Sequence, residues 1–425
     1  MNVSQRVLYT TIAQIAGKTA LALAGLVTLR IATSYLGVEG FGEYAIVLAL
    51  APILLVFADL GIATLLAREL VQTPERREEL AATMLWFRLA ASAAVVLAVL
   101  AIAPFLPYEH HVRVGLVIAS LGVSLFSAGS FAMPFFQVNL RLDFIALLDV
   151  LVAVLMVGLV AAVALFDLGF YALVGVHAGV GLANAVAAVW LVRRFWRPSL
   201  RFDLGLARRL VADGLPLAAV IVLGLLHFRL DAVLLSLLRP AEDVGVYTVA
   251  YRFLEQSLVL PGVFMAAVFP LLAAAVRGGD AADVVRKAFS FLLLMGVPLA
   301  LALVVLAEPL VALVAGEGFE AAAVPLRILA PALVFTFVNA VFAAVLIALN
   351  RQRALILVSL AGLALNVLVN LYAIPRFGYV GAAVTTVISE GIGLCAVFVL
   401  ARRALSFRLS PRLVTRSDVA LLLGR

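Results

Sequence analysis

The sequence is poor in the residue types that build catalytic and metal sites. Its single cysteine, Cys395, excludes both a disulfide framework and a cysteine metal site. Its four histidines are too few and too scattered to predict a metal site: His110, His111, His177 and His227. Charged residues make up only 13% of the chain, against about 25% in an average soluble domain. This composition excludes a soluble globular protein.

Lysine is also rare, although the chain is basic overall. Of the 31 basic residues, only Lys18 and Lys287 are lysines, and the formal net charge is +7. A basic balance is typical of nucleic-acid-binding proteins, but membrane topology alone also makes a chain basic. We therefore expect no nucleic-acid partner.

Long apolar runs dominate the sequence. Hydrophobic residues make up 65% of the chain, and the mean hydropathy is +1.19. Runs of roughly 20 residues can cross the bilayer as helices. The sequence predicts an all-α polytopic membrane protein with twelve spans, at 7–34, 44–66, 81–106, 113–137, 144–166, 170–192, 213–237, 246–275, 287–315, 325–349, 354–374 and 380–401.

The distribution of basic residues predicts the orientation. If the N-terminus lies inside, only Arg113, Arg239 and Arg376 among the basic residues fall in outer segments. Such a bias is the positive-inside pattern of membrane proteins. We expect a multi-pass protein of the cytoplasmic (inner) membrane with both termini in the cytoplasm.

The two halves of the chain carry similar segments. Gly42-Glu43-Tyr44 recurs as Gly245-Val246-Tyr247, and Asn139-Leu140-Arg141 resembles the segment that begins at Asn350. Six spans in each half make this a parallel repeat, and transporters commonly bind their substrate between such repeats. The expected domains are an N-terminal six-helix bundle at 1–200, a C-terminal six-helix bundle at 201–403 and a basic cytoplasmic tail at 404–425.

Eleven charged side chains fall within the predicted spans, where each costs roughly 2.5–3.5 kcal/mol against lipid. We expect most of them to face a hydrated cavity or one another, and Asp149 and Arg327 to reach the membrane surface from span ends. Arginine binds phosphate and carboxylate through a bidentate fork, so a cavity with several arginines favours an anionic cargo. Structural ion pairing is the alternative for all of them. The candidate cargo-binding residues are Lys18, Arg30, Arg88, Arg229 and Arg252, and the candidate ion-coupling residues are Asp59, Asp231 and Glu255.

Several other motifs do not predict chemistry. Ala16-Gly17-Lys18-Thr19 resembles the end of a P-loop, but it lies in a predicted helix and lacks the first glycine, so we expect no ATP site and no cofactor. Gly175 and Gly179 form a Gly-x-x-x-Gly pattern, which predicts close helix packing. Glu109-His110-His111 falls in an outer loop, where we expect solvated side chains.

One stretch resembles the start of the polysaccharide repeat-unit flippases, in the superfamily that also holds multidrug extruders and lipid II flippases. It comprises Tyr35-Leu36-Gly37-x-Glu39-Gly40-Phe41-Gly42-x-Tyr44, Asp59-Leu60-Gly61 and Arg68-Glu69, and the second half agrees in Asp231 and Gly245-x-Tyr247-x-x-Ala250.

The resemblance implies a protein that moves undecaprenyl-diphosphate-linked oligosaccharides to the outer leaflet for capsule, exopolysaccharide or O-antigen synthesis. It also implies cargo-binding roles for Arg30 and Arg252, and work alongside a polysaccharide polymerase and glycosyltransferases. Some relatives continue to fourteen helices, whereas here we expect twelve and a tail at the membrane surface. The alternatives are a cation-coupled multidrug or metabolite antiporter of the same superfamily, and a membrane enzyme, for which the sequence has neither a large outer loop nor a catalytic constellation.

Overall fold

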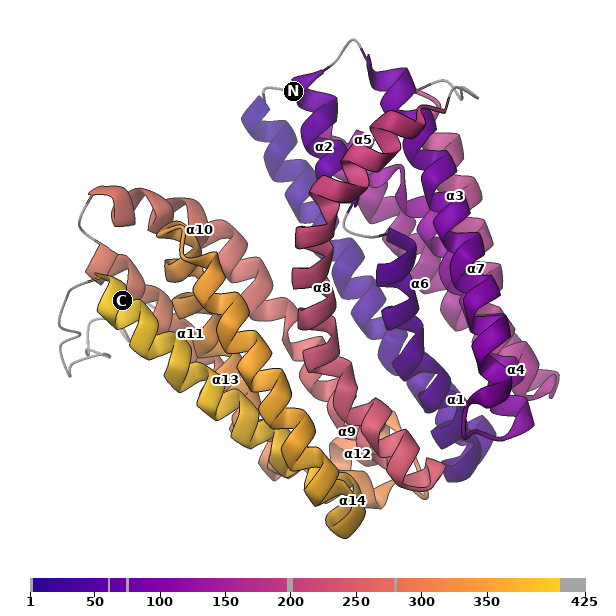
Figure 1. The fold of residues 1–425 in the computed structure, drawn as a ribbon. Helices are drawn as coiled ribbons and strands as arrows, with labels where there is room; N and C mark the ends of the chain where they lie inside the picture. The colour runs from indigo at the N-terminus through magenta and orange to yellow at the C-terminus, as the bar shows by residue number, and fades with distance from the viewer. Residues whose placement is uncertain (1–2, 60–61, 74–75, 197–201, 279–280, 406–425) are drawn as a thin grey trace. The chain divides into compact units, whose positions relative to one another are not determined.

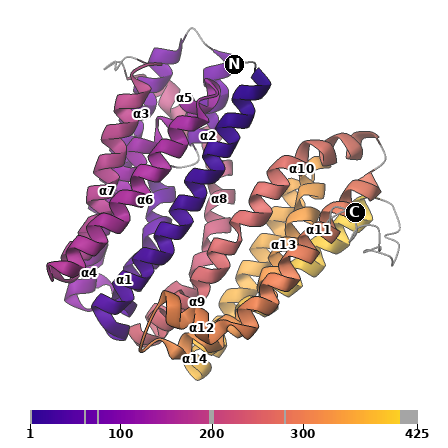
Figure 2. The same cartoon turned by 180° about the vertical axis from the view of Figure 1, so that it is seen from behind.

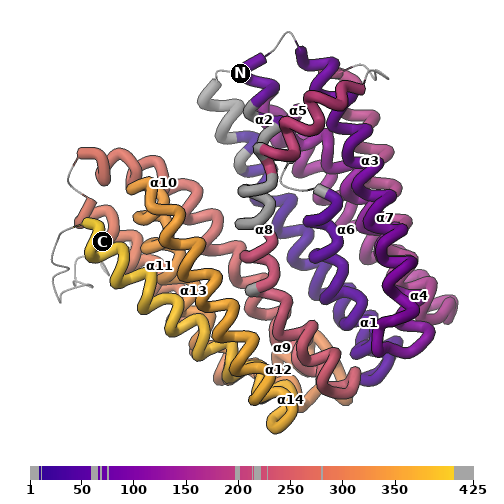
Figure 3. Tube along the Cα trace, viewed as in Figure 1, coloured from indigo at the N-terminus to yellow at the C-terminus, as the bar shows by residue number. Residues whose placement is uncertain are grey.

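Helices form all the regular structure in the residues that the computed structural model describes, which are 3–59, 62–73, 76–196, 202–278 and 281–405 (Figure 1). Figure 3 traces the chain as a tube along its Cα atoms. Two short 3-10 turns, η2 (Ala103–Phe105) and η3 (Glu320–Ala322), accompany them. The α-helices in chain order are α1 (Val3–Asp59), α2 (Ile62–Gln72), α3 (Arg77–Ile102), α4 (His110–Ser130), α5 (Met133–Val138), α6 (Leu142–Leu165), α7 (Gly169–Val192), α8 (Leu204–Leu238), α9 (Ala241–Ser257), α10 (Val259–Gly278), α11 (Ala281–Val305), α12 (Ala307–Val314), α13 (Ala323–Ala348) and α14 (Gln352–Leu405) (Figure 1).

Glycines divide the two longest helices. α1 has 57 residues, and at about 1.5 Å per residue a straight helix of this length would far exceed a bilayer core of roughly 30 Å. It breaks at Gly37 (φ 67°, ψ −171°), and α14 breaks in the same way at Gly378 (φ 56°, ψ −136°). A side chain is strained at such positive φ values, so glycine is the residue that allows the chain to turn there.

The breaks reconcile the helices with the predicted spans. Nine described helices are long and apolar enough to cross a membrane, and two of these, α1 and α14, each overlap two predicted spans. α8 covers the predicted span 213–237. Each predicted span therefore overlaps a described helix, and the prediction of an all-α polytopic membrane fold is confirmed.

The chain forms two compact units, which we call unit 1 (Met1–Arg229) and unit 2 (Leu230–Arg425). Their division falls inside α8, because Leu206 and Leu210 at the start of this helix pack in the core of unit 1 with Phe131, Phe135 and Trp196. The predicted domain boundary at residue 200 and most of the predicted tail lie outside the described residues.

Glycines bring α4 and α7 together in unit 1, where the two helices run side by side (Figures 1 and 2). A Cβ atom on Gly181 would lie 2.7 Å from the carbonyl oxygen of Gly122, and one on Gly122 would lie 2.9 Å from the carbonyl carbon of His177. By contrast, Gly175 has nothing within 4 Å of its Cβ position. The sequence prediction of close packing at Gly175 and Gly179 was therefore wrong in register.

A matching turn supports the internal repeat. Leu140 in unit 1 and Asn350 in unit 2 both adopt left-handed backbone conformations, with φ of 52° and 57°. The next residue closes each turn in the same way, because Arg141 N–H donates to Phe136 O and Arg351 N–H donates to Leu346 O, both at 2.8 Å. The structure thus pairs Leu140 with Asn350, whereas the sequence comparison paired Asn139 with Asn350.

Candidate functional site

A buried carboxylate in unit 2 gathers polar side chains from three helices. Asp231 on α8 is 1% exposed. Its Oδ2 accepts hydrogen bonds from the Tyr247 hydroxyl of α9 at 3.1 Å and from the Thr386 hydroxyl of α14 at 2.5 Å. Its Oδ1 accepts a hydrogen bond from Asn370 Nδ2 of α14 at 2.7 Å. All the described groups that donate hydrogen bonds to this carboxylate are thus neutral.

The break at Gly378 builds this polar cluster from the two halves of α14. Asn366 and Asn370 lie one turn apart in the first half, and Asn370 Nδ2 donates to Asn366 Oδ1 at 3.0 Å. Ser389 follows Thr386 by one turn in the second half, and Asn366 Nδ2 lies 3.4 Å from Ser389 Oγ. Because the chain reverses between the halves, positions 23 residues apart meet.

One acceptor in this cluster has no hydrogen-bond partner among the residues that the structure describes. This acceptor is Oδ1 of Asn370, a fully buried residue. Within the described residues, no cationic side chain forms an ion pair with Asp231. An isolated buried carboxylate is costly unless it is neutralised. The carboxylate and amide oxygens are ligands that hard cations prefer, so the cluster has the chemistry to bind a proton or a small cation.

The other acidic candidates have different surroundings. Glu255 Oε2 lies 3.2 Å from Arg252 Nη1, one turn away on α9, so a side chain already supplies a positive charge there. Asp59 lies at the end of α1, and its side chain is outside the described residues. Asp149, expected to reach the membrane surface, instead forms an ion pair with Lys18 of α1 at 3.0 Å.

The basic candidates divide by exposure. The Arg30 side chain is exposed on α1, and its Nη1 donates to Ser34 Oγ at 3.0 Å, so a neutral group holds it. Lys18 is also exposed and forms an ion pair with Asp149, whereas Arg252 is half-buried and forms an ion pair with Glu255. Arg229 is half-buried on α8, two residues before the buried Asp231.

Arg88 has a different position from the one expected of a cargo-binding residue. It is 1% exposed on α3, and its Nη1 donates to the carbonyl oxygen of Ser127 on α4 at 2.8 Å and to Ser130 Oγ. The guanidinium therefore links α3 to α4 inside unit 1.

Two family comparisons place the chain among membrane transporters. The polysaccharide biosynthesis protein family matches residues 4–276, and the MatE family matches residues 216–372. The chain belongs to the polysaccharide biosynthesis protein family. It is a membrane transporter of the superfamily that joins these proteins to the multidrug extruders, the MOP superfamily, as the resemblance in its sequence predicted.

Solved structures share the fold. The lipid II flippase MurJ in an inward closed conformation superposes with a TM-score of 0.74 at 12% identity, over 94% of this chain and 89% of that chain. The Vibrio cholerae MATE transporter VcmN gives 0.65 at 18% identity, over 95% and 98%. A MOP superfamily transporter from Pyrococcus furiosus gives 0.63 at 17% identity, over 94% and 95%. A search of curated proteins finds no significant match.

Proposed function

We propose that this protein flips undecaprenyl-diphosphate-linked oligosaccharide repeat units from the inner to the outer leaflet of the cytoplasmic membrane by alternating access. Both termini would lie in the cytoplasm, and the polymerase and glycosyltransferases of the same polysaccharide pathway would use and supply the cargo. Membership of the polysaccharide biosynthesis family supports the cargo class.

The observation that carries the cargo assignment is the exposed Arg30 on α1. No described carboxylate forms an ion pair with its guanidinium, which donates instead to the Ser34 hydroxyl. A diphosphate would supply the missing negative charge through charge-assisted hydrogen bonds. Arg252 is the second proposed contact, because Glu255 pairs with only one of its nitrogens, Nη1. Lys18 and Arg229 are secondary candidates.

Asp231 is the proposed coupling site. The buried carboxylate together with the unpartnered Asn370 oxygen offers negative charge and a ligand to a small cation. Binding and release of that cation, or of a proton, would bias the conformations between which transport occurs. This coupling would equally serve a multidrug or metabolite antiporter, and the MatE family match covers the segment that contains Asp231 and Asn370.

The cargo proposal is tested by leaflet-resolved export of a lipid-linked oligosaccharide in cells that lack their own flippase. We expect the wild type to restore export, and Arg30→Ala and Arg252→Ala to reduce it at equal membrane expression. Arg193→Ala and Arg353→Ala are the controls, because both side chains are exposed at helix ends. Normal export by both test variants would refute the roles of these arginines. Failure of the wild type across several glycans, together with cation-dependent drug efflux, would favour the antiporter.

The coupling proposal is tested separately with Asp231→Asn, which keeps the side-chain shape and removes the charge. We expect transport by this variant to be slow and independent of the imposed ion gradient. Asp283→Asn is the matched control, because this aspartate already pairs with Lys287 at 2.8 Å at the start of α11. An unchanged response of Asp231→Asn to the gradient would exclude coupling through this carboxylate.

A further inference from the structure

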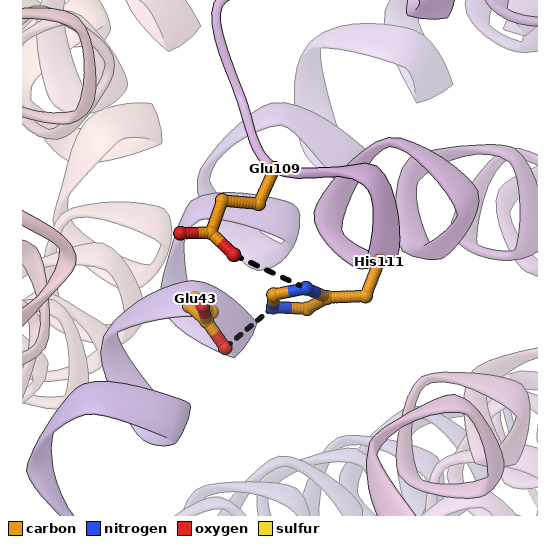
Figure 4. Close-up of side chains that lie close together, drawn as sticks. All are labelled: Glu43, Glu109 and His111. Atoms are coloured by element: carbon orange, nitrogen blue, oxygen red, sulfur yellow. Dashed lines mark ion pairs between the residues drawn. The ribbon is translucent and has the colours of Figure 1, made fainter.

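Three potential metal ligands meet in unit 1, far from the Asp231 cluster in the sequence. Glu43 lies in the second half of α1, Glu109 directly precedes α4, and His111 belongs to the first turn of α4 (Figure 4). One atom from each residue lies within 4.8 Å of the other two. Because Glu109 and His111 fall in a predicted outer loop, we expected their side chains to be solvated; instead Glu43, which is remote along the chain, lies beside His111.

The two ring nitrogens of His111 face different carboxylates. Nε2 lies 2.7 Å from Glu43 Oε2, which is hydrogen-bond distance. Nδ1 lies 3.6 Å from Glu109 Oε2, which is too long for a hydrogen bond. A tetrahedral zinc ion with bonds of about 2.1 Å separates neighbouring ligand atoms by about 3.4 Å. The second distance therefore suits two ligands of one ion.

We propose that His111 Nδ1 and Glu109 Oε2 bind a divalent transition-metal ion of the zinc type, and that Glu43 orients the imidazole. With Nε2–H donating to Glu43, the lone pair of Nδ1 is directed toward Glu109. A metal-bound histidine that donates its other ring N–H to a carboxylate is a common arrangement, because it selects the tautomer and strengthens the ligand. Water would complete the coordination shell.

The surroundings leave the negative charges available to such an ion. Two carboxylates and a neutral imidazole carry two negative charges, which a divalent ion would balance. Arg113, the nearby guanidinium on α4, donates to the backbone carbonyl oxygens of Tyr108 at 2.6 Å and Pro104 at 3.1 Å. Imidazole is a good ligand for zinc and similar transition-metal ions, whereas magnesium prefers sites made of oxygen ligands alone. The histidine therefore favours a metal ion of the zinc type.

The geometry also fixes the imidazole and leaves access for an ion. The rings of His111 and Phe170 pack edge to face, with their centroids 5.4 Å apart and an interplanar angle of 90°. The Glu43 side chain is 17% exposed, whereas that of Glu109 is 77% exposed. His111 and Glu43 are therefore held in place, whereas the exposed Glu109 side chain can move from solvent onto the ion.

Through the contact between Glu43 and His111, the site would connect the second half of α1 to the start of α4. About 34 residues of α1 precede the break at Gly37, enough to cross a bilayer, so the site lies on the opposite side from the N-terminus. By the predicted orientation this is the outer side, where external metal ions would reach it. This site is separate from the proposed transport function and does not depend on the cargo.

Calorimetric titration of the purified full-length protein with zinc chloride, in detergent and without a histidine tag, tests the proposal. We expect saturable binding of one ion per chain by the wild type. His111→Ala and Glu109→Gln should abolish saturable binding, and Glu43→Gln should weaken it about 10- to 100-fold, as the loss of an orienting partner does. His110→Ala is the matched control, because this adjacent histidine is exposed and outside the cluster. It should bind as the wild type does.

Circular dichroism melting of each variant separates loss of the site from loss of the fold. Absence of saturable zinc binding by the wild type would overturn the proposal and leave an ion pair between His111 and the glutamates. Equal affinity in His111→Ala and the wild type, or displacement of zinc by an equal concentration of magnesium, would also overturn it. X-ray absorption at the zinc edge should show one nitrogen ligand together with oxygen ligands.

Discussion

Replacement of Gly381 by alanine should destabilise unit 2 by forcing apart the two halves of α14. A Cβ atom at this position would lie 2.5 Å from the carbonyl oxygen of Ala373 and 2.7 Å from its carbon. Restoring an ordinary contact of about 3.4 Å requires the halves to separate by about 0.9 Å, and both clashing atoms are backbone. Overpacking costs roughly 1–3 kcal/mol, and a backbone clash belongs at the upper end of that range.

The helical preference of alanine opposes this cost. Glycine to alanine within a helix gains about 0.5–1 kcal/mol. We therefore expect a net loss of about 2 kcal/mol for Gly381→Ala. Gly393, on the same half of α14, is the matched control, because nothing lies within 4 Å of its Cβ position. Gly393→Ala keeps the helical gain without the clash and should stabilise the protein.

Circular dichroism melting in detergent should rank Gly393→Ala at or above the wild type and Gly381→Ala below it. The three tryptophans of the chain, Trp86, Trp190 and Trp196, all lie in unit 1, so their fluorescence would not report unit 2 directly. A melting midpoint of Gly381→Ala equal to or above that of the wild type would show that the halves of α14 do not pack as closely as described. The same variant should weaken any cation binding at Asp231, because Asn370 and Thr386 lie on opposite halves.

Four further predictions follow from local geometry. Gly181→Ala should lower the melting midpoint, because the added Cβ atom would lie 2.7 Å from a backbone oxygen. Gly175→Ala should not lower it, because nothing lies within 4 Å of that Cβ position. Asn350→Ala should cost about 1 kcal/mol in the free energy of unfolding because of the left-handed backbone, and Asn350→Gly should be close to neutral. The hydrogen bond that the Leu206 N–H donates to the Asp203 carboxylate lowers the pKa of this group below 3.8. The stability that this hydrogen bond contributes should be present above pH 3.8 and should disappear as the pH falls through the lowered pKa. Melting curves against pH should show this acid loss in the wild type and not in Asp203→Asn. Finally, a cation at 100 times its dissociation constant should stabilise the wild type by about 2.7 kcal/mol and leave Asp231→Asn unchanged in thermal melts.

The fold class was predictable because membrane insertion imposes a simple rule on the sequence. Every backbone polar group in lipid must be bonded within its own helix, so long apolar runs correspond to helices. The breaks at Gly37 and Gly378 were harder to predict, because the same residue type occurs inside straight helices, as at Gly175 and Gly393. Their backbone angles depend on the turn that follows each span.

Packing registers were not predictable from spacing alone. Gly175 and Gly179 have the spacing of a close-packing motif, but α4 approaches α7 at Gly181 instead. Which face of a helix meets a neighbour depends on its rotation about its axis, and an almost uniformly apolar helix carries little information about that rotation. The helix therefore contains several glycines of which only some pack closely.

The Asp231 cluster was predictable only in part. The charge of Asp231 within a span drew attention, since ionisable residues in membranes are rare and costly. Its partners, Asn366, Asn370 and Thr386, are neutral and cost far less, so they did not stand out. The signal that could have found them is the one-turn spacing of polar residues on both sides of Gly378, with Asn366 and Asn370 before it and Thr386 and Ser389 after it.

Asp149 and Asp231 show why a charge within a span does not by itself identify a coupling site. The carboxylate of Asp149 has Lys18 at 3.0 Å, so its charge is balanced by the protein. The carboxylate of Asp231 has hydrogen bonds from neutral hydroxyl and amide groups, which orient it without balancing its charge. In the proposed coupling, only the second arrangement would gain from an external cation. Its occupancy would then respond to an ion gradient, which is the property that coupled transport requires.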